Sequence, residues 1–151
     1  MNLEAVAAGY APRSADVFAS RTARKPPTAA ALAWATAGVD ASDLACLLYT
    51  LGHEDSRHTV GFLLDGLVAK RARAAKWRSG RAAGIVRLTM RELPYGRMSP
   101  LTDAERAFIA GVSRRQWYAR WQDEWHWARD QIWARATRAA KLMRYRAEGE
   151  D

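Results

Sequence analysis

The sequence predicts an all-α protein, in which a helical domain is followed by a helix-turn-helix and a long C-terminal helix. Three observations support this fold class. Alanine is abundant and β-branched residues are few and scattered, so the backbone favours helix over strand. Large apolar residues recur at helical spacing in several segments. Capping residues and glycines stand where those segments begin and end.

Length and composition are those of a globular, basic protein. With 151 residues, the chain can bury a core without disulfides or metal ions. Apolar residues make up 49% and charged residues 26%, which is typical of a folded domain and not of a disordered chain. The net charge of +8 favours a polyanionic partner, most often nucleic acid. A basic protein without such a partner is the alternative.

Prolines and glycines divide the chain into three parts. Residues 1–27 are expected to form an N-terminal basic arm that is loosely attached. Residues 28–98 are expected to form a helical domain. Residues 99–151 are expected to form the helix-turn-helix with its extended C-terminal helix. Pro94, Gly96 and Pro100 mark the boundary between the last two parts.

Four helices are expected in the helical domain. They cover residues 28–37, residues 40–51 with a cap at Asp40 or Ser42, residues 56–77 with a cap at Ser56, and residues 81–93. The apolar residues of the third helix fall within one narrow arc at 100° per residue: Val60, Leu63, Leu64, Leu67 and Val68. The helices of this domain should therefore pack around a shared apolar core.

Two capping boxes follow one another closely after this domain. Thr102 stands three residues before Glu105, and Ser113 stands three residues before Gln116. Gly111 lies between the two boxes and can adopt the left-handed conformation that ends a helix. The pattern predicts one helix over residues 103–110 and a second one that begins at residue 114, joined by a sharp corner.

The packing residues of the predicted corner agree with a helix-turn-helix. Ala107 is small enough for the two helices to approach, and Val112 and Trp117 can fill the angle between them. Arg106 and Arg120 depart from the pattern, because such motifs usually have apolar residues at these places. Corners of this kind also occur in proteins that do not bind DNA.

The second helix of the motif is expected to present polar side chains outward. In DNA complexes such a helix enters the major groove with its first turns at the base edges, where arginine can bond guanine and glutamine can bond adenine. The candidate DNA-binding residues are Ser113, Arg114, Arg115, Gln116, Tyr118 and Gln122.

The second helix should also be long, because residues 112–147 contain no glycine or proline. Its apolar residues form one stripe: Trp117, Trp121, Trp125, Ala128, Ile132, Ala139 and Met143. This stripe is expected to pack on the rest of the protein. The alternative is an aromatic surface for a partner protein, for which Trp127, Trp133 and Tyr145 are the better candidates because they lie off the stripe.

Most of the basic surplus lies in two segments, residues 57–97 and residues 111–146. If both line one face, they would bind phosphates without reading sequence. The candidate phosphate-contacting residues are Lys70, Arg71, Arg73, Lys76, Arg87 and Arg91. Two solvated helix faces are the alternative.

Residue patterns that carry catalysis are missing, so we expect no enzyme, no cofactor and no metal site. His53, His58 and His126 are scattered, and no nucleophile–base pair or phosphate-binding glycine loop is identifiable. The single cysteine, Cys46, lies in an apolar run and is read as a core residue. No apolar run is long enough to cross a membrane and no signal core follows Met1, which predicts a cytoplasmic location.

Residues 81–147 resemble the late-gene antitermination proteins of bacteriophages, the Q-like group. Three features carry the resemblance: the basic helix over residues 84–88, the tripeptide at 105–107 with the block at 111–121, and the long basic C-terminal helix. The resemblance implies a protein in the bacterial cytoplasm that binds double-stranded DNA at a late promoter and loads onto RNA polymerase. By position, it assigns DNA contacts to Ser113, Arg114, Arg115, Tyr118 and Gln122. Some members carry a cysteine-ligated zinc, which this chain cannot form with Cys46 alone.

Two other functions remain open from the sequence. The first keeps DNA binding but assigns it to a repressor or to the DNA-recognition subunit of a phage packaging machine. The second is an interaction protein that inhibits a host enzyme through its tryptophan-rich helix. The sequence predicts neither the DNA target nor the oligomeric state.

Overall fold

Helices and short helical turns make up nearly all secondary structure over residues 36–149, the part of the chain that this computed structural model describes. No strand occurs within these residues, and the all-α prediction is confirmed. The arm expected over residues 1–27, and all but the end of the helix expected over residues 28–37, lie outside them. Across the described range, no helix combines the length and the hydropathy that a membrane crossing requires.

The first described helix, α4, spans Ala41–Thr50 and is capped by Asp40, one of the two residues predicted as its cap. The Asp40 carboxylate accepts hydrogen bonds from the backbone amides of Ser42 and Asp43, at 2.9 and 3.1 Å. Cys46 lies in a run of consecutive buried residues, 45–50, which agrees with its prediction as a core residue. Burial also raises the pKa of the Cys46 thiol to about 11, so the sulfur stays protonated and unreactive.

Helix α5 spans Arg57–Ala74 and is entered through a 3-10 turn, η1, at Glu54–Ser56. The Ser56 side chain makes no capping bond, so the predicted cap is wrong and the turn takes its place. The helix also ends before the predicted residue 77. Lys76 adopts a left-handed conformation, which changes the direction of the chain after α5. The next residue, Trp77, then packs edge-on against Trp121, with ring centroids 4.9 Å apart. A contact with a distant helix therefore sets this end.

Helix α6 spans Arg81–Glu92 and continues into a 3-10 segment, η2, at Leu93–Met98. Gly96 breaks the helical conformation inside η2. The expected boundary falls here, but one hydrophobic cluster includes buried residues on both sides of it, such as Leu93 and Ala107. Residues 94–101 therefore connect two segments of a shared core.

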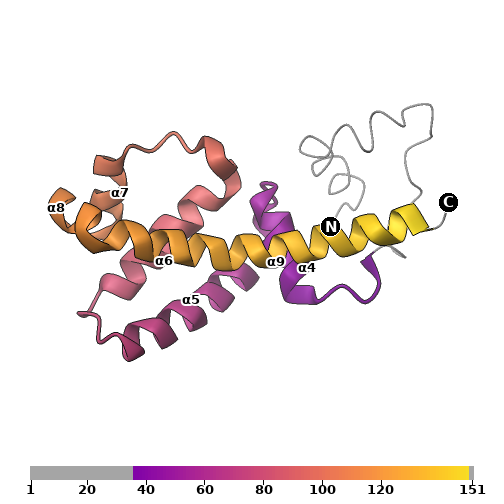
Figure 1. Cartoon of the computed structure of the whole chain (residues 1–151), viewed down its shortest axis with the longest axis horizontal. Coiled ribbons are helices and arrows are strands. Elements are labelled where there is room, and N and C mark those ends of the chain that lie inside the picture. The colour runs from indigo at the N-terminus through magenta and orange to yellow at the C-terminus, as the bar shows by residue number, and fades with distance from the viewer. Residues whose placement is uncertain (1–35, 150–151) are drawn as a thin grey trace.

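The C-terminal part is a helical corner followed by a long helix. Helix α7 spans Asp103–Ala110, α8 spans Arg114–Gln116, the π-helical turn η3 spans Trp117–Trp121, and α9 spans Gln122–Gly149. The last three follow one another without interruption. In Figure 1, α9 crosses the molecule from the corner at α7 and α8 to α4 and beyond, and it packs against α4, α5 and α6 on the way.

The predicted apolar stripe of the long helix packs inward. All its members are buried except Met143, which is half-buried. Trp117, Trp121 and Trp125 are spaced by four residues. Because a π turn contains more residues than an α turn, residues at this spacing stay on the same face of the helix. The stripe is therefore core, as expected.

Candidate nucleic-acid interface

The corner at Gly111 has the geometry that the sequence predicts. Gly111 is left-handed, with φ of 75°. Its backbone amide donates to the Phe108 carbonyl at 3.1 Å, and the amide of Val112 donates to the Ala107 carbonyl at 3.0 Å. This pair of bonds is the Schellman motif, which ends a helix and turns the chain sharply. The chain through position 111 is thus bent and not a continuous rod.

Both predicted capping boxes are confirmed. The Thr102 hydroxyl accepts from the Glu105 amide at 3.2 Å, and the Thr102 amide donates to the Glu105 carboxylate at 2.8 Å. The Ser113 hydroxyl accepts from the Gln116 amide at 3.1 Å, and the Ser113 amide donates to the Gln116 side-chain oxygen at 3.0 Å. These bonds satisfy amides that a helix start leaves unpaired, so α7 and α8 begin at defined residues.

The corner sits directly on α6. Gly84 faces the end of α7 so closely that a Cβ at this position would lie 2.9 Å from the Ala110 carbonyl carbon, and closer still to its oxygen. The Arg81 guanidinium donates to the carbonyl of Gly111, and that of Arg87 reaches the Ile109 carbonyl at 3.5 Å. Backbone contact and two arginines therefore position the corner on the core.

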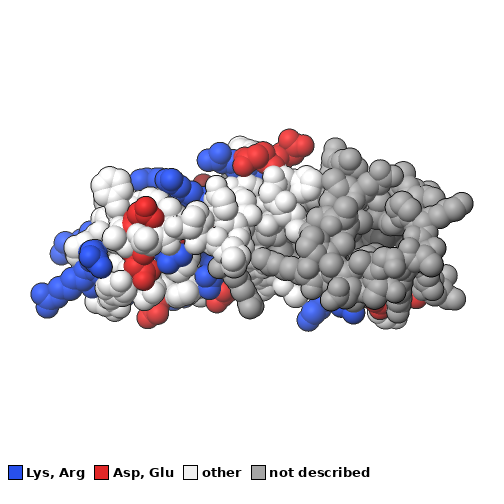
Figure 2. Space-filling model, turned by 90° about the horizontal axis from the view of Figure 1, so that it is seen from above, with Lys and Arg blue, Asp and Glu red and all other residues white. Residues whose placement is uncertain are grey.

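The candidate DNA-binding residues form the outer surface of this corner. Ser113, Arg114, Arg115, Gln116 and Tyr118 are exposed. Gln122 is half-buried, one turn further along. Figure 2 shows basic side chains projecting at the end of the molecule where α7 and α8 lie.

The exposed side chains of the corner differ in how many hydrogen bonds and ion pairs they already make within the protein. The side chains of Arg114 and Arg115 make no hydrogen bond or ion pair with any residue in the 36–149 range. The side chains of Ser113 and Gln116 serve the capping box, which leaves the Gln116 amide nitrogen to donate elsewhere. The Tyr118 hydroxyl donates to the Asp103 carboxylate at 3.4 Å. The two arginines are therefore the side chains of the corner best placed to meet a ligand.

Arg106 stands where such motifs usually have an apolar residue, and its charge is balanced by two carboxylates. Its guanidinium donates to Glu92 at 2.8 Å and to Asp103 at 3.1 Å, and it lies over the Trp125 ring at 4.8 Å. Burial alone would lower the pKa of Arg106, but the bonds to both carboxylates hold this pKa above its ordinary value. Arg106 thus packs between α6, α7 and α9 in place of an apolar residue.

Arg120 also packs against aromatic rings. Its guanidinium lies 4.8 Å from the Trp121 ring centroid and 6.0 Å from that of Trp77. A guanidinium over an aromatic face is attracted by the ring while its edge stays in water. Both departures from the apolar pattern of the motif therefore have a structural role.

The six candidate phosphate-contacting residues do not form one group. Lys70, Arg73 and Lys76 are exposed at the end of α5, and α6 packs between α5 and α7. Arg71 is already engaged, because it pairs with Glu124 at 2.5 Å and lies 4.3 Å from the Trp127 ring centroid. We therefore omit Arg71 from the candidate interface.

Arg87 and Arg91, the other two candidates, are exposed on α6 and line an open cleft between α5 and α6. The cleft was not anticipated from the sequence, nor was the bond between Arg81 and Gly111. Both join segments that are far apart in the chain, and no local pattern marks them.

Metal-ligating side chains do not gather in the described part of the chain, where no group of three or more His, Cys, Asp or Glu residues could hold an ion. No protein-family model, curated protein sequence or solved structure matches the chain. The likeness to Q-like proteins thus remains an interpretation of sequence motifs.

Proposed function

We propose that the chain is a sequence-specific, DNA-binding transcription regulator that reads duplex DNA with the first turns of the helix after Ser113. One observation supports this proposal above all. Arg114 and Arg115 are exposed at the start of a helix that follows a left-handed corner, and no described residue binds either guanidinium group.

The chemistry of that helix start suits a DNA groove. An α-helix fits the major groove, and a helix presented by its N-terminal end brings its first side chains to the base edges. Arginine bonds guanine through two donors, which discriminates this base from the others. The amide end of the helix also favours a nearby phosphate.

Exposed basic residues elsewhere support nucleic acid as the ligand. Lys70 and Arg73 in the last turns of α5 and Lys76 in the turn after it are all exposed, and the whole chain carries a net charge of +8. Contacts of this kind release counterions from DNA, so they strengthen binding without reading sequence.

The sequence resemblance favours antitermination within this class. In that role, the protein would bind DNA at a phage late promoter and load onto RNA polymerase. A repressor or a packaging subunit would use the same corner but form a defined oligomer, which sedimentation would reveal. Inhibition of a host enzyme through the tryptophan-rich helix has less support, because two of its three candidate side chains, Trp127 and Trp133, are half-buried, and only Tyr145 is well exposed.

A selection from random duplex DNA tests the proposal. We expect enrichment of one sequence motif, and a binding constant that falls steeply as salt is raised. Replacing Arg115 by alanine should weaken the selected site by about 1–3 kcal/mol, while leaving binding to random DNA less affected. Lys141→Ala is the matched control, because it removes an exposed positive charge on α9 away from the corner.

Two results would overturn the proposal. The first is the absence of DNA binding even at low salt. The second is equal loss of specific binding in Arg115→Ala and Lys141→Ala, since this would show that only total charge matters.

A further inference from the structure

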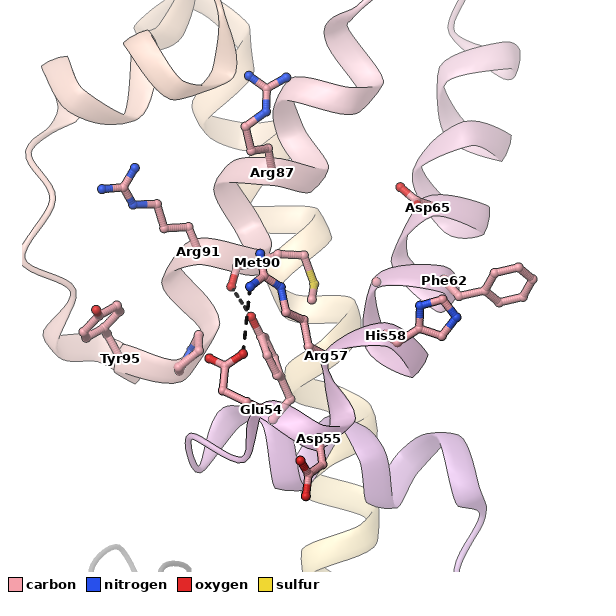
Figure 3. A pocket seen from close by; sticks show the side chains of 13 residues that line it. Glu54, Asp55, Arg57, His58, Phe62, Asp65, Arg87, Met90, Arg91 and Tyr95 are labelled. Carbon is pink, nitrogen blue, oxygen red and sulfur yellow. Dashed lines mark hydrogen bonds and ion pairs between the residues drawn. The ribbon is translucent and has the colours of Figure 1, made fainter.

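An open cleft of about 820 Å³ separates two walls of the helical domain. Figure 3 shows η1 and the first half of α5 on one side, and the second half of α6 with η2 on the other. Tyr49 and Met90 form its floor, where the Tyr49 hydroxyl donates to the Met90 carbonyl at 2.7 Å. Gly61 adds no side chain here, and a Cβ on it would meet only the Met90 methyl group, at 3.8 Å. The hollow thus has a fixed, apolar base.

Two aromatic side chains stand out of this cleft into solvent. Phe62 on α5 is 78% exposed, and Tyr95 on η2 is 57% exposed. Seven of the other eleven lining residues are exposed as well. A site for a small molecule encloses most of its ligand. An open trough with aromatic rims instead suits a segment of a macromolecule, which would cover these rings.

Opposite charges line the two walls. Glu54, Asp55 and Asp65 come from η1 and α5, as does Arg57, which pairs with Glu54 at 3.9 Å, and Arg87 and Arg91 come from α6. Asp55 and Asp65 have no ion-pair partner in residues 36–149.

Two carboxylates elsewhere in the same range show the contrast, because each is paired with an arginine. Asp43 binds Arg138 at 3.0 Å, and Glu124 binds Arg71. Although the protein is strongly basic, the cleft therefore presents two carboxylates, those of Asp55 and Asp65, that no described cation neutralises.

This arrangement excludes nucleic acid as the best occupant. A phosphate backbone carries only negative charge, so it would gain from Arg87 and Arg91 but be repelled by Asp55 and Asp65, which no described cation pairs with. A protein segment can carry both signs at once, with an apolar ridge between them. The cleft therefore favours protein over DNA, although Arg87 and Arg91 were expected to contact phosphates.

We propose that this cleft binds an amphipathic helix of a partner protein. The apolar ridge of that helix packs on Phe62, Met90 and Tyr95, as in other grooves that bind one face of a helix. Its Lys/Arg flank faces Asp55 and Asp65, and its Asp/Glu flank faces Arg87 and Arg91. The exposed aromatic rings supply most of the affinity, and the charges fix the direction of the helix.

Selection from a phage-displayed library of helix-forming peptides tests this proposal on the full chain. Selected peptides are expected to share an apolar ridge with basic residues on one flank and acidic residues on the other. Phe62→Ala should weaken their binding at least tenfold. Phe108→Ala is the matched control, because Phe108 is 86% exposed on α7 and does not line the cleft. Unfolding curves of both variants should overlay that of the parent.

Charge reversal then tests the direction of the helix. A variant with both Asp65→Lys and Arg91→Glu should lose the selected peptides and bind versions in which the basic and acidic residues are exchanged. The proposal is overturned if Phe62→Ala and Phe108→Ala bind the peptides equally, or if the selected peptides lack the two charged flanks. DNA binding by these variants is measured separately, so failure here leaves the function proposed for the corner intact.

Discussion

Gly84 of α6 lies directly against the carbonyl group of Ala110, the last residue of α7. No side chain separates the two helices at this point, since even a methyl group would overlap the carbonyl. Arg114 and Arg115 follow Ala110 by four and five residues, just after the corner. This contact therefore sets how the proposed reading helix is presented.

Replacing Gly84 by alanine should destabilise the protein and displace the corner. The added methyl would meet backbone atoms, which cannot move aside as a flexible side chain would. Overpacking of this kind typically costs about 1–3 kcal/mol, which urea unfolding measures directly. The selected DNA site should be bound more weakly as well.

Gly66→Ala provides the control for the Gly84 variant. Gly66 lies inside α5, has a helical conformation and has nothing within 4 Å of its missing Cβ. Alanine there should raise the free energy of unfolding by roughly 0.5–1 kcal/mol, because it restricts the unfolded chain without a clash. If both variants shifted stability in the same direction, the close contact with Ala110 would not be the cause.

A second prediction concerns the conformation of Gly111. Its φ of 75° is unfavourable for residues with a side chain, and its missing Cβ has no close neighbour apart from the tip of Arg81 at 4.0 Å. Gly111→Ala should therefore cost about 1–2 kcal/mol through backbone strain alone. Gly111→Asn should cost less, because asparagine tolerates this conformation better. An alanine variant as stable as the parent would contradict this account.

Features that depend on a few neighbouring residues could be predicted from the sequence. The caps at Asp40, Thr102 and Ser113 and the helix end at Gly111 all rest on bonds between residues at most five positions apart. Burial of the apolar stripe followed from periodicity. The corner at Gly111 could therefore be predicted, because it depends on such local bonds and on the spacing of apolar residues.

Features that depend on how distant helices meet could not be predicted. The early end of α5 depends on Trp77 reaching Trp121 of the long helix. The role of Arg106 depends on Glu92 of α6, and the cleft depends on where α5 and η2 lie. Composition and spacing carry no signal for such pairs, because they show which residues are apolar or charged but not which distant residue each one meets.

A third prediction concerns the buried ion pair between Glu92 and Arg106. Glu92 is only 3% exposed, and its carboxylate accepts from Arg106 and from the Ser99 hydroxyl at 2.9 Å. Arg106→Leu removes the cation and leaves this carboxylate buried, which should cost about 3–5 kcal/mol. Adding Glu92→Leu should recover much of that loss, because the buried carboxylate is then removed together with its cation. A double-mutant cycle from urea unfolding gives the coupling, and additive losses would argue against a paired cluster.

The last prediction is a dependence of stability on pH through Asp103. Burial alone would raise the pKa of this carboxyl, but hydrogen bonds from Arg106, Trp117 and Tyr118 hold it below its ordinary value. A group with a lowered pKa in the folded state contributes its full stability above the pKa of the unfolded chain, about 3.9. This contribution is lost as pH falls from there through the folded pKa.

Urea midpoints measured from pH 6 down to pH 2.5 should show this loss. The Asp103→Asn variant should start lower at pH 6, because a neutral amide accepts the three bonds less strongly. It should also lose less stability than the parent as the pH falls, because one titrating carboxyl is gone. Curves that stay parallel over the whole range would show that Asp103 does not titrate differently in the folded and unfolded states. Since Asp103 also binds Tyr118 of the corner, specific DNA binding by Asp103→Asn should weaken even at neutral pH.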